Sequence, residues 1–102
     1  MSGTADRLDL EMSGATVVVR GELDAFSAVQ LSDSLAPRLL AGAVVLDLRA
    51  VTFIDSRGLA ALLQVHRSAE ESGGCVRMIA GRRVRRLFEL AGLDGYLHVD
   101  EG

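Results

Sequence analysis

The polar tetrapeptide Asp55-Ser56-Arg57-Gly58 places a carboxylate, a hydroxyl and a cation side by side. It follows a short apolar segment, residues 51–54, and leads directly into an amphipathic stretch with helical periodicity. Functional groups of α/β proteins gather at the carboxyl ends of strands. A serine there lies beside open backbone N–H groups and the positive end of the helix dipole, where a phosphoryl group is tolerated. Ser56 is therefore a candidate phosphorylation site, and the alternative is that Asp55 or Ser56 is only an N-cap.

Three aspartates are candidates for a cation site, because hard cations favour carboxylates. They are Asp24, Asp47 and Asp55, and no pair has a diagnostic metal-ligand spacing. The favoured interpretation gives Asp24 an N-cap role, Asp47 a role as a strand-end hydrogen-bond acceptor, and Asp55 a role as loop support. We predict neither a metal nor a cofactor.

The histidines give little support to catalysis. His66 falls on the apolar face of a predicted helix and His98 in the last predicted strand. A triad of Ser56, His66 and an aspartate is disfavoured, because Ser56 lacks the G-x-S-x-G elbow and His66 lies roughly 15 Å further along the helix. We expect that the chain is not an enzyme, and a small serine hydrolase is the weakest alternative.

The elements around this segment follow from periodicity and turn signals. Residues 8–12 alternate apolar and charged, and residues 15–20 are a β-branched run, which together predict an opening hairpin. A helix capped by Asp24 follows, which Pro37 should kink or end early. A strand covered on both faces is then predicted at residues 43–48, and a separate short apolar segment at residues 51–54. After these come a helix at 58–72, a strand at 75–80, a short helix at 82–91 and a last strand at 96–99.

This order predicts an α/β fold with one mixed sheet, built from the opening hairpin and βαβ units and flanked by helices. The 102 residues are enough for one domain over residues 1–102, with residues 1–6 expected to be frayed. Because 49% of the residues are hydrophobic and only 4% aromatic, the core must be aliphatic. Strands and helix faces account for most apolar residues, so a monomer is expected.

Composition also bounds the location and the partners. A net charge of −3 argues against nucleic-acid binding, which depends on Lys and Arg. No apolar stretch approaches the roughly 20 residues that span a bilayer, and no signal peptide is recognisable. The single cysteine, Cys75, fits a reducing compartment, so we expect a cytoplasmic protein without a membrane partner. The last predicted helix carries four arginines opposite its apolar stripe: Arg82, Arg83, Arg85 and Arg86. We interpret them as a solvated face, and the alternative is a docking patch for a partner.

Four stretches together resemble the anti-sigma factor antagonists of bacteria, members of the STAS domain family. Residues 53–59 resemble the D-S-x-G-L signature of that family, and residues 21–24 resemble its G-E-L-D. Residues 44–48 resemble its V-V-L-D-L strand, and residues 86–93 its R-L-F-x-x-x-G-L tail. The resemblance covers almost the whole chain. It departs from the commonest pattern at Arg57, where a second Ser or Thr is frequent.

The resemblance implies a STAS fold and a partner-switching role. An unphosphorylated antagonist binds an anti-sigma factor that is itself a serine kinase, and so frees a sigma factor. By this resemblance the kinase would phosphorylate Ser56, a phosphatase would reset it, and the partner-binding residues would be Asp24, Asp55, Ser56, Arg57 and Gly58. The alternative is a STAS module of a larger regulatory assembly or transporter system, with a nucleotide or a lipid as its ligand.

Overall fold

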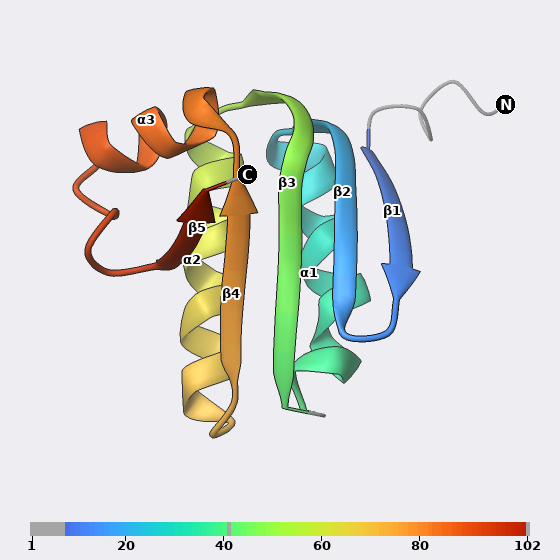
Figure 1. The fold of residues 1–102 in the computed structure, drawn as a ribbon. Helices are drawn as coiled ribbons and strands as arrows, with labels where there is room; N and C mark the ends of the chain where they lie inside the picture. Colours follow the sequence, from blue (N-terminus) through green and yellow to red (C-terminus); the bar gives the residue numbers. More distant parts are fainter. Residues whose placement is uncertain (1–7, 41, 102) are drawn as a thin grey trace, which may run out of the picture.

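The computed structural model describes residues 8–40 and 42–101, so the predicted frayed end lies outside the described residues. The described part of the chain forms one five-stranded sheet and three helices (Figure 1). In chain order, the elements are β1 (Leu8–Ser13), β2 (Thr16–Leu23), α1 (Ala25–Leu39), β3 (Ala43–Ile54), α2 (Ser56–Glu71), β4 (Cys75–Ala80), α3 (Arg82–Leu90) and β5 (His98–Glu101).

The strands lie in the order in which they occur in the sequence. β1 and β2 form the predicted antiparallel hairpin, and β2, β3, β4 and β5 are mutually parallel neighbours joined by one helix each. The predicted mixed α/β fold is confirmed. Leu23 pairs with Ile54 in the register of β2 and β3, so these two strands end together at one edge of the sheet.

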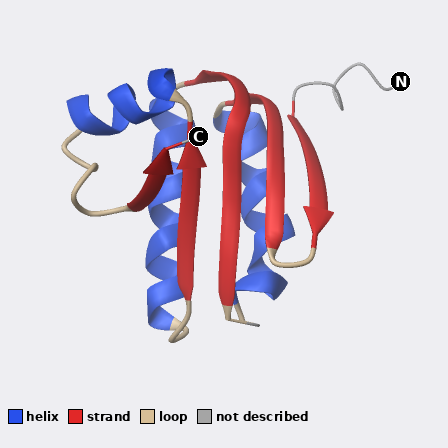
Figure 2. Ribbon diagram, in the orientation of Figure 1, coloured by secondary structure: helices blue, strands red, loops and turns tan. Residues whose placement is uncertain are grey.

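The long helices α1 and α2 both pack on the same face of the sheet, behind the strands in Figure 2. α3 lies near the carboxyl end of β4 (Figure 1). The core between these layers is aliphatic, as expected: among the described buried hydrophobic residues, the one aromatic side chain is Phe88. Its largest fully buried aliphatic members are Leu8, Leu23, Leu31, Leu35, Leu46, Leu48, Leu62 and Met78.

The opposite face of the sheet differs from the prediction that residues 43–48 are covered on both sides. Val44, Leu46 and Leu48 are buried, but the alternating positions of the sheet carry ion pairs instead of a packed helix. These pairs are Arg20 with Glu11 at 2.8 Å, Arg49 with Asp47 at 2.7 Å and Arg77 with Asp100 at 3.0 Å. Charged side chains therefore shield this face of the sheet from solvent, and we call it the shielded face.

Several boundaries also differ from the predictions. β3 is one strand from Ala43 to Ile54, where two segments were predicted. A register shift in its pairing with β2 accommodates residues 49–50, which lie between the two predicted segments. α1 passes through Pro37, which has no amide to donate to the carbonyl four residues earlier, and the helix ends two residues later, within the predicted range. α2 begins two residues earlier than predicted. β5 begins two residues later, because the amides of Tyr96 and Leu97 still donate to the Leu93 carbonyl in a turn.

None of the helices in the described ranges has both the length and the apolar character needed to cross a membrane.

Candidate partner-binding site

Two helices begin side by side where β2 and β3 end (Figure 1). Asp24 caps α1, as predicted: its Oδ1 accepts from the backbone amides of Phe26 and Ser27, both at 3.1 Å. The Ser27 hydroxyl accepts from the Asp24 amide at 2.8 Å, which completes a capping box. Asp24 is buried, so its carboxylate holds the start of the helix rather than facing the exterior.

Asp55 performs the same task for α2, which decides the question left open by the sequence. Its Oδ1 accepts from the amide of Gly58 at 2.9 Å, and its own amide donates to the carbonyl of Leu23 at 3.2 Å. The N-cap is therefore Asp55, and Ser56 is the first residue of the helix with its side chain exposed. Ser56 is consequently a hydroxyl at the surface without a capping duty.

Gly58 lies buried where α2 crosses the end of β2. A β carbon at this position would overlap with the carbonyl oxygen of Leu23, so the close approach of helix and strand requires glycine. Arg57, between Ser56 and this contact, is exposed. Of the predicted partner-binding residues, Ser56 and Arg57 thus face outward, Asp55 is half-buried, and Asp24 and Gly58 support the local backbone.

Two hollows flank the start of α2. One, of about 310 Å³, lies between α2 and α3 and is lined in part by Ser56, Leu59 and Leu90. The other, of about 480 Å³, lies between α1 and α2 and is lined in part by Val29 and Arg57. Ser56 and Arg57 therefore stand on a ridge between two shallow depressions.

Exposed apolar side chains lie near this ridge: Val29 and Leu90 line the two hollows, and Phe26 and Phe53 are each two residues from a helix cap, Asp24 or Asp55. Phe26 is 79% exposed and Leu90 73%, and Val29 and Phe53 are also exposed. Sequence reasoning missed these four residues, because it assigned nearly all apolar residues to strands and helix faces. The available signal was that Phe26 and Val29 fall outside the 3.6-residue stripe of α1 that contains Leu31.

The three aspartates do not gather into a cation site. Asp47 lies on the shielded face of the sheet, within β3 rather than at its end, and accepts from the Arg49 amide at 3.1 Å, from Nε at 2.9 Å and from an Nη at 2.7 Å. These hydrogen bonds from the Arg49 side chain, opposed in part by burial, hold the pKa of Asp47 below its ordinary value. Asp24 and Asp55 are occupied as helix caps.

His66 is buried on α2 and its polar neighbours are Glu70 and His98, not Ser56. The geometry gives Ser56 no histidine base of the kind that a hydrolase triad requires.

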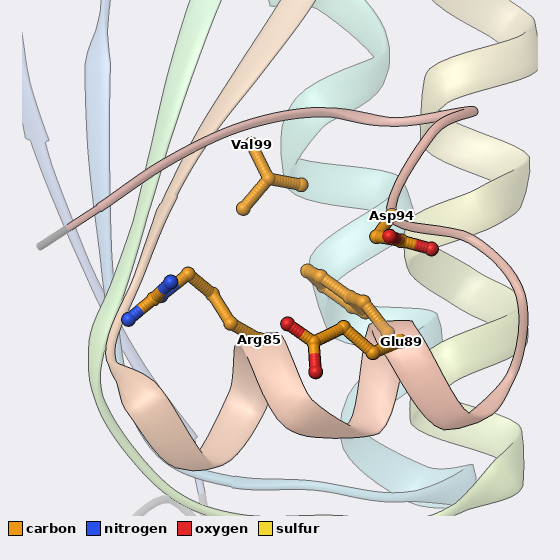
Figure 3. A pocket seen from close by; sticks show the side chains of 5 residues that line it. Arg85, Glu89, Asp94 and Val99 are labelled. Atoms are coloured by element: carbon orange, nitrogen blue, oxygen red, sulfur yellow. The ribbon is translucent and has the colours of Figure 1, made fainter.

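The prediction that the four arginines of α3 form one solvated face holds only in part. Arg85 is half-buried in the hollow of Figure 3, whereas Arg82, Arg83 and Arg86 are exposed.

The hollow in Figure 3 lies between α3 and the last strand and holds about 210 Å³. Its lining combines the guanidinium of Arg85, the carboxylates of Glu89 and Asp94, and the apolar side chains of Phe88 and Val99. Small-molecule sites usually enclose about 300–1,000 Å³. This hollow is therefore smaller than a typical nucleotide or lipid site, and it is separate from the ridge at Ser56.

Known proteins resemble this chain in sequence and in fold. The family model described as "Mlab, STAS domain" matches residues 7–99. The chain is 30% identical over 89 residues to the anti-sigma-B factor antagonist of Staphylococcus aureus (strain NCTC 8325 / PS 47), with 84% of this chain and 82% of the relative covered. The corresponding protein of Staphylococcus epidermidis shows the same identity and coverage.

Solved structures agree with the sequence matches. The anti-sigma factor antagonist from Mycobacterium paratuberculosis superposes with a TM-score of 0.72 at 28% identity, over 90% of this chain and 82% of that chain. SpoIIAA in its unphosphorylated form gives the same TM-score at 24% identity, over 93% of this chain and 87% of that chain, which shows a shared fold. The chain belongs to the STAS domain family, together with the anti-sigma factor antagonists that it matches.

Proposed function

We propose that this protein is an anti-sigma factor antagonist that binds an anti-sigma factor serine kinase around Ser56 and is switched off by phosphorylation of Ser56. The named role of its relatives supports the general activity. The single observation that carries the site is the exposed Ser56 hydroxyl at the first position of α2, on a ridge bordered by exposed apolar side chains. We call this ridge and its border, Phe26, Val29, Phe53, Ser56, Arg57 and Leu90, the Ser56 surface.

The Ser56 surface has the chemistry of a docking site. Its apolar members lie on three different elements, α1, the end of β3 and α3. Val29 lines the hollow between α1 and α2, and Leu90 lines the hollow between α2 and α3. Exposed apolar groups that gather in one region and carry a polar rim mark protein interaction sites. A partner that covers Ser56 would therefore gain affinity from Phe26, Phe53 and Leu90 and would desolvate the hydroxyl between them.

A phosphoryl group on Ser56 can be added without unfolding the domain. Of the four amides at the start of α2 that have no partner within the helix, Asp55 donates to the carbonyl of Leu23 and Gly58 donates to the Asp55 carboxylate. The amides of Ser56 and Arg57 remain at the positive end of the helix dipole, and Arg57, a cation, is the next residue in the chain. These groups favour a dianion in the free protein.

The same dianion opposes binding, because a partner that covers Ser56 must desolvate a charge of about −1.5 to −2 next to apolar groups. A coupling free energy of about 3–4 kcal/mol would reduce affinity several hundredfold. The switch needs no change of fold, since the charge acts where the partner docks. In this scheme Asp24, Asp55 and Gly58 hold the ridge in shape, and Arg57 contributes both to the contact and to recognition by the kinase.

The proposed cycle involves protein partners only. The kinase supplies the phosphate from ATP and a separate phosphatase removes it from Ser56, so the antagonist itself performs no turnover. It acts in the cytoplasm and is a monomer when free, and the switch at Ser56 uses no cofactor, nucleic acid or membrane. Binding to the kinase is stoichiometric.

Intact-mass spectrometry after incubation with ATP, Mg²⁺ and candidate anti-sigma kinases tests this function. We expect one added phosphate that maps to Ser56, no phosphate on Ser56→Ala, and unchanged phosphorylation of Thr52→Ala, which removes a nearby exposed hydroxyl. Unphosphorylated protein and Ser56→Ala should both bind the kinase, while Ser56→Asp binds poorly. Phosphate on Thr52 instead, or kinase binding that is unaffected by phosphate, would contradict the switch.

A second candidate is a STAS module of a larger assembly or a transporter system, favoured by the description of the matching family model as an Mlab domain. It uses the same Ser56 surface for a protein contact but requires no kinase. Failure of every candidate kinase to bind or to phosphorylate the protein would support this second function.

A further inference from the structure

Both histidines of the chain lie at one place in the fold, although they are far apart in the sequence. His66 is on α2 and His98 begins β5, and the centroids of their rings are 5.6 Å apart. Glu70, one helical turn beyond His66, brings a carboxylate oxygen to 3.5 Å from Nε2 of His66. Ligand atoms of these three residues all lie within 4.8 Å of one another.

We propose that His66, Glu70 and His98 form a binding site for a divalent transition-metal ion of the Zn²⁺ type. Imidazole nitrogens and carboxylate oxygens bind Zn²⁺ with bonds of about 2.0–2.2 Å, and a tetrahedral shell then separates neighbouring ligand atoms by about 3.3–3.5 Å. The distance of 3.5 Å between Nε2 of His66 and the Glu70 carboxylate already matches that separation. The remaining ligand atoms need an adjustment of about 1 Å.

The cluster combines one fixed ligand with two that can adjust. His66 is only 1% exposed, and its ring packs edge-on against Tyr96 with the centroids 4.8 Å apart. Glu70 and His98 are exposed, so their side chains can rotate toward an ion without disturbing the core. Three protein ligands leave the fourth tetrahedral position for water. The ion joins the edge strand β5 to α2.

The groups that form hydrogen bonds to the metal ligands affect the expected affinity of the site for the ion. Nδ1 of His66 is buried, and within the described ranges no group forms a hydrogen bond to it. A histidine that binds a metal through one nitrogen usually donates the other N–H to an acceptor, and the loss of such a partner lowers affinity about 10- to 100-fold. We therefore expect a weaker site than a structural zinc centre with a complete outer shell.

Titration of the full chain, without a histidine tag, tests this site by calorimetry with Zn²⁺ and by visible absorption with Co²⁺. We expect one ion per chain and the intense visible bands of tetrahedral Co²⁺. At a hundredfold excess of Zn²⁺ over Kd, Tm should rise by about 10 °C relative to protein in EDTA. His98→Ala and Glu70→Gln should each weaken binding at least tenfold. Both residues are exposed, so these variants should fold, unlike a variant of the buried His66.

Two matched variants separate this cluster from other ligands. Glu71→Gln changes the neighbouring exposed carboxylate, and Cys75→Ser removes the thiol, and both should bind Zn²⁺ within twofold of the unmodified chain. The proposal is overturned if no saturable binding occurs up to millimolar Zn²⁺. It is equally overturned if His98→Ala keeps full affinity or if Cys75→Ser abolishes it.

Discussion

The Cα of Gly58 lies against the carbonyl of Leu23, and this contact joins the start of α2 to the end of β2. The same carbonyl accepts the amide of Asp55 at 3.2 Å. One backbone oxygen therefore positions both the N-cap of α2 and its first buried residue. Ser56 and Arg57 lie between these two fixed points, and so the ridge that they form is held by the backbone rather than by their side chains.

Replacement of Gly58 by alanine should destabilise the domain. The added β carbon must displace the Leu23 carbonyl, which is backbone and cannot rotate away. Overpacking costs about 1–3 kcal/mol, and a clash with backbone belongs at the upper end of that range, above the roughly 1 kcal/mol that alanine gains in a helix. Urea unfolding followed by circular dichroism measures the loss. Gly95→Ala is the matched control, because a β carbon there meets no atom within 4 Å, and it should change stability by less than about 0.5 kcal/mol. Equal stability of the two variants would contradict the close contact.

The capping geometry predicts different effects at two adjacent residues. Asp55→Ala should lose about 1 kcal/mol of unfolding free energy, because the amide of Gly58 loses its acceptor. Asp55→Asn should keep most of the stability, since asparagine caps as well as aspartate. Ser56→Ala should stay within about 0.5 kcal/mol of the unmodified chain, because the Ser56 side chain has no cap bond. Chemical denaturation of the three variants checks this order, and a loss above about 1 kcal/mol in Ser56→Ala would return the capping role to the serine.

The sequence predicted the order of elements and the place of Ser56 because both depend on local signals. Alternation in β1, the 3.6-residue stripe of α1 and the cap at Asp24 are properties of short segments. The mixed sheet also followed, because strands that alternate with helices build parallel βαβ units and the opening hairpin adds an antiparallel pair. The order of the strands in the sheet was not predicted and comes from the structure. The fold could therefore be inferred without distances between remote residues.

Features that depend on tertiary contacts could not be predicted in this way. Phe26 and Val29 are exposed because α1 turns its other side to the sheet, and only the packed structure shows that Val29 lines the same hollow as Arg57. The convergence of His66 and His98 depends on β5 lying at the edge of the sheet beside α2. Neither arrangement leaves a spacing pattern in the sequence.

The ion pair of Asp47 and Arg49 predicts a pH dependence of stability. Hydrogen bonds from Arg49 hold the pKa of Asp47 below its ordinary value of 3.8 in the folded protein. A group whose pKa is lowered by folding stabilises the protein above its unfolded pKa, and this contribution is lost as the pH falls through the folded value. The stability advantage of the unmodified chain over Asp47→Asn should therefore be constant from pH 5 to 7 and shrink below about pH 4.

Urea unfolding of both proteins between pH 2.5 and 7 measures this difference. Asp33→Asn, an exposed carboxylate on α1, serves as the control for general effects of charge at low pH. An advantage over Asp47→Asn that persists unchanged down to pH 2.5 would show that the Arg49 contact does not depend on the charge of Asp47.

The Ser56 surface predicts that Leu90 contributes to partner binding and that Leu40 does not. Both are leucines at helix ends with similar exposure, 73% and 79%, but Leu90 lines the hollow beside Ser56, whereas Leu40 follows the opposite end of α1. Leu90→Ser should weaken binding to the kinase at least tenfold, since buried apolar anchors at an interface are worth about 1–2 kcal/mol or more. Leu40→Ser should bind within twofold of the unmodified chain, and calorimetry on both variants measures the difference. If Leu40→Ser weakens binding as much as Leu90→Ser does, the partner contact is not centred on Ser56.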